Sequence, residues 1–257
     1  MSLTLGKSSL FRYAAPQVFY GIAGRLAPWF AMAAALFALV GLWVGFFIAP
    51  TDAQQGEVYR IIFIHVPAAW ASMIIYLAMA FWSGIGLVMN TRMSFLMSRA
   101  LAPTGAMFCF IALWTGALWG KPTWGAYWVW DARLTFQLLL LFLYMGYMAL
   151  TRSIANPARA DRAGAVIALV GAINVPIIYF SVKWWNTLHQ GASVSLTQAP
   201  SMAMTMLAGM LLMACAAWSY AAAVSLWRVR PMILKRERHA AWAAPALAVD
   251  QLSGENA

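Results

Sequence analysis

Six long apolar segments dominate this chain and restrict what it can fold into. Each approaches the roughly 20 mainly apolar residues that a helix needs to cross a bilayer. Such spans must be helical, because lipid offers no partner for unpaired backbone NH and CO groups. The sequence therefore predicts an all-α, polytopic membrane protein with six transmembrane helices, near residues 27–49, 63–89, 101–119, 134–150, 164–182 and 202–227.

The basic residues are sorted between the connections of these segments. Four of the 17 lie on one side, at Arg60, Lys121, Arg133 and Lys183, and the other 13 lie on the opposite side. Because Lys and Arg gather in cytoplasmic connections, both termini are predicted to be cytoplasmic. The net charge of +10 therefore reflects orientation in the membrane, and no nucleic-acid partner is expected.

This orientation gives the expected organisation of the chain. A cytoplasmic or interfacial segment, 1–26, precedes a six-helix domain, 27–227, and a cytoplasmic tail, 228–257, that we expect to be disordered. No cleavable signal peptide is evident. The outward-facing connections are expected at about 50–62, 120–133 and 183–201.

Two absences limit the chemistry. Cys109 and Cys215 lie in predicted spans without a C-x-x-C-H motif, so neither a thioether-bound haem nor a disulfide is expected. The chain also lacks a G-x-x-x-x-G-K-[ST] motif, so any ATP-driven step would need a partner. We expect a binding protein and not an enzyme.

The second outward connection is unusually aromatic. Residues 119–133 read W-G-K-P-T-W-G-A-Y-W-V-W-D-A-R, with Trp119, Trp124, Trp128 and Trp130 close together. Trp and Tyr also collect at membrane interfaces as simple anchors. An extended segment would place Trp128 and Trp130 on one face, whereas a helix would place Trp124 and Trp128 together. Either arrangement offers a flat apolar surface against which a porphyrin could lie.

Two of the three histidines flank this stretch. His65 and His189 fall in the first and third outward connections, whereas His239 lies in the basic tail. Alone, each would be read as an interfacial polar residue. As a pair they suit a six-coordinate haem iron, which accepts one imidazole on each axial side. Zinc stays open, with Asp52, Glu57 or Asp131 as additional ligands.

Other polar residues have structural alternatives. Asp131 stands at the expected start of the fourth span, an N-cap position, and capping is compatible with ligand contact. Arg133 suits either Asp131 or a haem propionate, because guanidinium pairs well with carboxylates. Asn174 and Pro176 fall within the fifth span, where we favour an interhelical hydrogen bond over a path through the membrane.

The run Trp124-Gly125-x-x-Trp128-x-Trp130-Asp131-x-Arg133 resembles the WWD signature of haem-handling membrane proteins. Roughly residues 27–230 are similar to the CcmC family of the bacterial cytochrome c maturation system. The resemblance implies that haem b binds non-covalently at the periplasmic face of the inner membrane. It also implies that His65 and His189 are axial ligands, and that the platform consists of Trp119, Trp124, Trp128, Trp130 and Asp131.

The same resemblance implies partners. Family members present haem to the haem chaperone CcmE, and CcmA with CcmB uses ATP to release the loaded chaperone. The small membrane protein CcmD assists, and membrane lipid surrounds the whole assembly. Three alternatives stay open: a haem-exporting channel subunit of an ABC-type complex, a b-type cytochrome that carries electrons, and a purely structural subunit.

Overall fold

The computed structural model describes residues 15–185, 189 and 201–248, and within these ranges the chain is helical, with six helical spans long and apolar enough to cross a membrane. The prediction of an all-α, multi-pass membrane protein is therefore confirmed. The main elements are α2 (Pro16–Trp43) with the π-helical η1 (Val44–Ile48), η2 (Glu57–Ile61) with α3 (Ile62–Met89), α4 (Arg92–Trp124), α5 (Ala132–Ser153), α6 (Pro157–Gly171), α7 (Asn174–Trp184) and α8 (Met204–Arg236).

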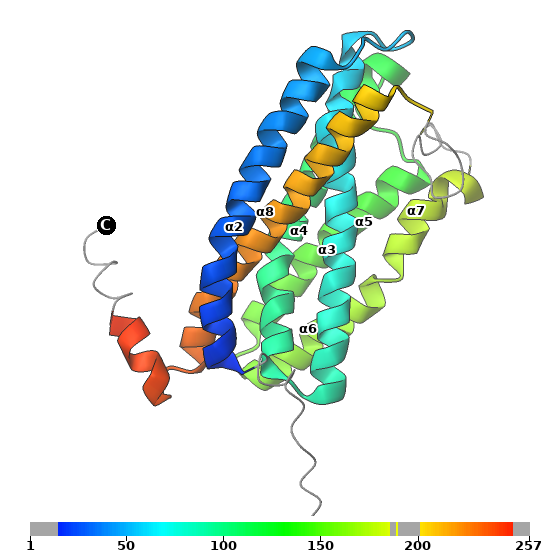
Figure 1. The fold of residues 1–257 in the computed structure, drawn as a ribbon. Helices are drawn as coiled ribbons and strands as arrows, with labels where there is room; N and C mark the ends of the chain where they lie inside the picture. Colours follow the sequence, from blue (N-terminus) through cyan, green and yellow to red (C-terminus); the bar gives the residue numbers. More distant parts are fainter. Residues whose placement is uncertain (1–14, 186–188, 190–200, 249–257) are drawn as a thin grey trace, which may run out of the picture.

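The helices run up and down between two ends (Figure 1). At the upper end, α3, α5 and α8 begin and α2, α4 and α7 finish. The most extensive packing joins α2 to α8 and α3 to α4, and α5 packs against α4, α6 and α7. The upper end therefore brings together the expected outward connections, although most of the third, 186–188 and 190–200, lies outside the described residues.

Several helices are longer than the sequence predicts. Asn90 ends α3 in the left-handed conformation, with φ of 51°, which Asn tolerates better than most residues. The following turn is so short that α4 begins at Arg92, so the expected start at residue 101 is wrong and Arg99 lies within the helix. The last helix, α8, continues to Arg236, into the expected tail.

The fifth span is broken between α6 and α7. Pro176 has no NH group to donate to the carbonyl oxygen of Ala172. The helical hydrogen-bond pattern is therefore interrupted between α6 and α7. Asn174, the first residue of α7, donates from Nδ2 to the carbonyl oxygen of Phe136 in α5 at 2.9 Å. The expectation of an interhelical hydrogen bond from Asn174 is confirmed.

An ion-pair cluster ties three helices together at the lower end. The Asp161 carboxylate in α6 is only 3% exposed and accepts from Arg236 of α8 at 2.8 and 3.0 Å. Arg99 of α4 lies 2.9 Å from the same carboxylate. One acidic side chain thus neutralises two guanidinium groups from elements far apart in the sequence.

We expect Asp161→Asn to destabilise the protein. The substitution removes the only charge that balances Arg99 and Arg236 in this cluster, and breaking one partner of a buried ion pair costs about 3 kcal/mol. The thermal midpoint in detergent should fall. Glu237→Gln, which removes a carboxylate outside the described ion pairs, is the control. Equal midpoints for the two variants would contradict the role of this cluster.

Candidate functional site: a pocket between two histidines

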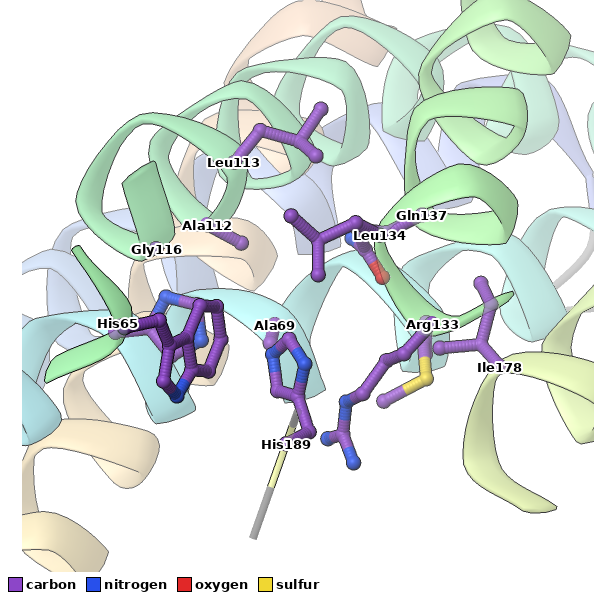
Figure 2. Close-up of a pocket in the computed structure, with 12 residues that line it drawn as sticks. His65, Ala69, Ala112, Leu113, Gly116, Arg133, Leu134, Gln137, Ile178 and His189 are labelled. Atoms are coloured by element: carbon purple, nitrogen blue, oxygen red, sulfur yellow. The ribbon is translucent and has the colours of Figure 1, made fainter. Parts of the chain in front are cut away.

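A pocket at the upper end contains both candidate histidines. His65 reaches it from the first turns of α3, Arg133 from the start of α5, and His189 from the segment that follows α7 (Figure 2). Trp124, the last residue of α4, also lines it. Of the residues predicted from the sequence, the structure therefore places these four around one space.

Thr115 of α4 fixes the protonation of the His65 ring. Its hydroxyl carries a single hydrogen, which is donated to the carbonyl oxygen of Ile111 at 2.7 Å. Thr115 Oγ1 also lies 3.1 Å from His65 Nδ1, and it must act as the acceptor in this contact. Nδ1 therefore carries the proton, and the ring nitrogen with a lone pair is Nε2, the usual arrangement for a metal-binding histidine.

The position of the His65 ring depends on a glycine beside it. A Cβ atom placed on Gly116 would lie 2.9 Å from His65 Cε1, closer than such contacts normally come. Trp119 meets the same imidazole edge-on, with ring centroids 5.7 Å apart. Its indole nitrogen donates to Gln55 Oε1 at 2.8 Å, which fixes the indole. His65 is thus held between a hydroxyl, a glycine and an aromatic ring.

Asp131 links the second histidine to the start of α5. One carboxylate oxygen accepts from the Leu134 amide at 2.8 Å, so the predicted N-cap is confirmed. The other lies 3.2 Å from His189 Nδ1, and the His189 ring packs against Trp124 with centroids 4.8 Å apart. Capping and histidine contact therefore occur together, on separate oxygens.

The ionisation state of Asp131 determines which group donates in the hydrogen bond between Asp131 and His189. Burial raises the pKa of Asp131, but the hydrogen bonds from His189 and from the Leu134 amide outweigh it. The pKa is therefore held below its ordinary value, and the carboxylate is ionised at neutral pH. An ionised carboxylate only accepts, so His189 Nδ1 carries a proton and, in the neutral ring, the lone pair lies on Nε2.

Arg133 brings positive charge to the pocket. Within the described part of the chain its guanidinium makes no hydrogen bond or ion pair, and the contact with Asp131 that we considered is not formed. Since five NH groups of an arginine suit carboxylate oxygens, Arg133 is placed to receive an anionic group that enters the pocket.

Trp128 and Trp130 lie outside the lining of the pocket. The α4 helix ends at Trp124, and Gly125 follows with φ of 80°, so the helical arrangement that would pair Trp124 with Trp128 is wrong. Trp128 and Trp130 instead contact each other in the non-helical segment, with centroids 5.4 Å apart. Trp130 is 76% exposed, which makes this pair an aromatic surface beside the pocket.

The enclosed space is small. It measures about 40 Å³, enough for about one water molecule, so a porphyrin does not fit into it without a rearrangement of the lining. Among the described residues no three His, Cys, Asp or Glu side chains come together as metal ligands. Asp52 instead accepts from two backbone amides, and Glu57 bonds to Thr51 and Arg60. This arrangement does not support a zinc site.

Sequence reasoning missed the residues that position His65. Thr115, Gly116 and Gln55 are unremarkable in the sequence, since each is a common residue in a span or a connection. One sequence pattern could have indicated them. Gly116 lies three residues before Trp119 and four before Gly120, so the three residues share a face of the helix. What the sequence could not supply is that His65 packs against that face.

Comparison with known proteins agrees with this geometry. The family model described as "Heme exporter protein C" (CcmC) matches residues 9–244. A "Heme exporter protein C" from Escherichia coli strain K12 is 46% identical over 239 residues, which cover 91% of this chain and 94% of that protein. The protein of the same name from Bradyrhizobium diazoefficiens is 46% identical over 228 residues, covering 89% and 86%.

A plant relative extends the comparison. A "Putative cytochrome c biosynthesis ccmC-like mitochondrial protein" from Marchantia polymorpha is 46% identical over 185 residues, which cover 72% of this chain and 73% of that protein. The matches span nearly all of the described helices. The expected family is confirmed: the chain belongs to the CcmC family of haem-handling membrane proteins that act in cytochrome c maturation.

Proposed function

We propose that this protein binds haem b non-covalently at the periplasmic face of a bacterial inner membrane and delivers it to the haem chaperone CcmE. One observation carries the proposal: His65 and His189, which are far apart in the sequence, line a single pocket, and each has its Nδ1 in contact with an oxygen of the protein. Two imidazoles with lone pairs on Nε2 provide the axial ligands of a six-coordinate haem iron.

Haem is the cargo here, and the protein supplies its position and electrostatics. Thr115 and Asp131 orient the two imidazoles, and the Asp131 carboxylate makes His189 a stronger donor to iron. Arg133 pairs with a propionate. Because the enclosed space is small, binding requires His189 and Trp124 to move away from His65, so that the porphyrin enters from the aromatic side.

Trp128 and Trp130 form the platform outside the histidine pair. The exposed Trp130 ring gives the edge of haem, or the chaperone that collects it, an apolar surface outside the pocket. The protein need not make or break bonds itself, because positioning haem for the chaperone is sufficient to promote the reaction that follows. CcmE then attaches the haem covalently, CcmA with CcmB supplies ATP-driven release, and CcmD assists.

The alternatives fit the site less well. An electron-carrying b-type cytochrome usually holds haem within the bundle, whereas both histidines here lie at the upper end. A haem channel would need a route through the bundle, whereas this pocket is small and lies near its upper end. A structural subunit would not need the paired hydrogen bonds that orient His65 and His189.

The proposal is tested by visible spectra of the purified chain with haem supplied. The wild type should show one low-spin haem with two histidine ligands. His65→Ala and His189→Ala should each lose the haem or convert it to high spin, because one axial ligand is removed. His239→Ala, in the lower-end tail, is the control. Unchanged spectra in both variants would overturn the ligand assignment, and transfer to CcmE should fail in parallel.

Gly116→Ala should disturb the same spectrum without touching a ligand. The added methyl group forces the His65 ring aside, an overpacking cost of about 1–3 kcal/mol. Gly146→Ala is a matched control in α5, because its Cβ would meet nothing within 4 Å. We expect weaker low-spin absorbance for Gly116→Ala alone. Identical haem titrations for both variants would contradict the positioning of His65 by this glycine.

Arg133→Gln should weaken haem binding about tenfold, the loss of one charge-assisted hydrogen bond. The measurement is a titration with haem and with haem dimethyl ester, which lacks the propionate charges. The variant and the wild type should bind the ester equally. If Arg133→Gln lowered affinity for both ligands to the same extent, Arg133 would act on the fold and not on a propionate.

A further inference from the structure

A second and larger cavity lies within the predicted membrane region. Its volume is about 500 Å³, and it is bounded by α2 and α8 on one side and by α3 and α4 on the other. Its walls are almost entirely apolar, and Tyr220 and Trp227 are the lining residues whose side chains carry a polar group. Because α8 packs against α3 and α4 as well as against α2, the cavity is a cleft between α2 and the α3–α4 pair, with α8 lining its length.

Small residues create this cleft. Four alanines at helical spacing line it from α2, and three more line it from α8, at Ala31, Ala34, Ala35, Ala38, Ala216, Ala217 and Ala223. Larger side chains from α4, Met107 and Phe108, close its inner wall. On α8 the lining runs from Met213 to Trp227, about 21 Å of helix at 1.5 Å per residue.

Arg230 continues the α8 face of the cleft toward the lower end. It follows Trp227 by three residues, so both side chains lie on the same face of α8. Its guanidinium stacks over the Tyr20 ring at 4.3 Å and fits against Gly24, where a Cβ would lie 3.1 Å from Cζ. The Arg230 Nε atom is buried and has no hydrogen-bond partner.

Arg228 lies on the α4 side of the same end. It donates to Thr104 Oγ1 at 2.9 Å and to the Ala100 carbonyl oxygen, one to two turns below Met107. In the described part of the chain neither Arg228 nor Arg230 forms an ion pair. The Asp161 carboxylate at the same end is paired with Arg99 and Arg236. Two uncompensated positive charges thus flank the lower end of an apolar cleft.

We propose that the cleft binds an anionic phospholipid, with one acyl chain between α2 and the α3–α4 pair and the phosphate at Arg228 and Arg230. The length of the cleft exceeds the roughly 15 Å depth of one leaflet, so it can take a full acyl chain. The lower end is the predicted cytoplasmic side, and basic pockets between spans on that side suit anionic headgroups. The two arginines without an acidic partner in the described part of the chain favour an anionic lipid over an apolar partner helix, which would cover the alanines but leave both charges uncompensated.

The test is lipid retention by the full-length purified chain, measured by native mass spectrometry. Phosphatidylglycerol and phosphatidylcholine with identical acyl chains are supplied at equal concentration. We expect phosphatidylglycerol to be retained about tenfold more strongly, because two arginines contact its phosphate without an opposing choline. Dihexanoyl phosphatidylglycerol should compete poorly on the wild type, because its chains are too short to fill the cleft.

Variants separate this site from general surface charge. The double variant Arg228→Gln/Arg230→Gln should lose the preference for phosphatidylglycerol. Arg152→Gln/Arg159→Gln, which removes the same charge from exposed positions at the same end, should keep it. Ala35→Leu should weaken retention by filling the cleft.

Three outcomes would overturn the proposal: equal retention of both lipids by the wild type, equal loss in the two double variants, and full competition by the short-chain lipid. Displacement of phosphatidylglycerol from the wild type by added haem would identify the cleft as a cargo site instead. His65→Ala should retain the lipid normally, so failure of haem binding and failure of lipid binding are distinguished.

Discussion

The absence of water from the bilayer interior is the constraint on which this structure depends. Backbone NH and CO groups cannot be left unpaired there, so every span is a helix, and polar side chains within spans need partners from their own or another helix. Asn174 reaches the Phe136 carbonyl, Tyr144 reaches the Ser72 carbonyl, and Gln137 reaches the Ser72 hydroxyl. Hydrogen bonds and one ion-pair cluster thus join helices whose contacts are otherwise mainly apolar.

The same constraint shapes the histidine pocket. A neutral imidazole at the edge of a membrane still needs a partner for its NH group, and Thr115 and Asp131 provide one to each ring. Satisfying the ring nitrogen that faces the protein leaves the lone pair on the nitrogen that faces a metal. Hydrogen bonding that the fold requires in any case therefore also gives both histidines the ring form that the proposed iron ligation needs.

Much of this architecture could be predicted from the sequence. The number and type of spans follow from hydropathy, because a span is defined by local composition. The ends of the spans were less accurate: α4 begins at Arg92 because Asn90 adopts a left-handed conformation, and hydropathy carries no information on such a turn. For the site, motif residues and both histidines were predicted, and the structure brings His65, His189, Trp124 and Arg133 together.

The supporting residues of the site could not be predicted. Thr115 and Gly116 matter only because α3 and α4 pack in one particular register, and that register results from the summed packing of two whole helices. Trp128 and Trp130 were expected to form a platform for a porphyrin, and the turn of the chain at Gly125 places them beside the pocket and not in its lining. Local sequence determines which residues are present, and tertiary packing determines which of them meet.

The short turn at Asn90 and Thr91 has a consequence for how the protein is made. It joins α3 and α4 into one hairpin, so that His65 near the start of α3 faces Thr115 and Gly116 near the end of α4. This half of the pocket is encoded in one continuous stretch and is complete once the hairpin has inserted into the membrane. His189 belongs to a later part of the chain, so every residue that orients His65 is synthesised before the second proposed iron ligand.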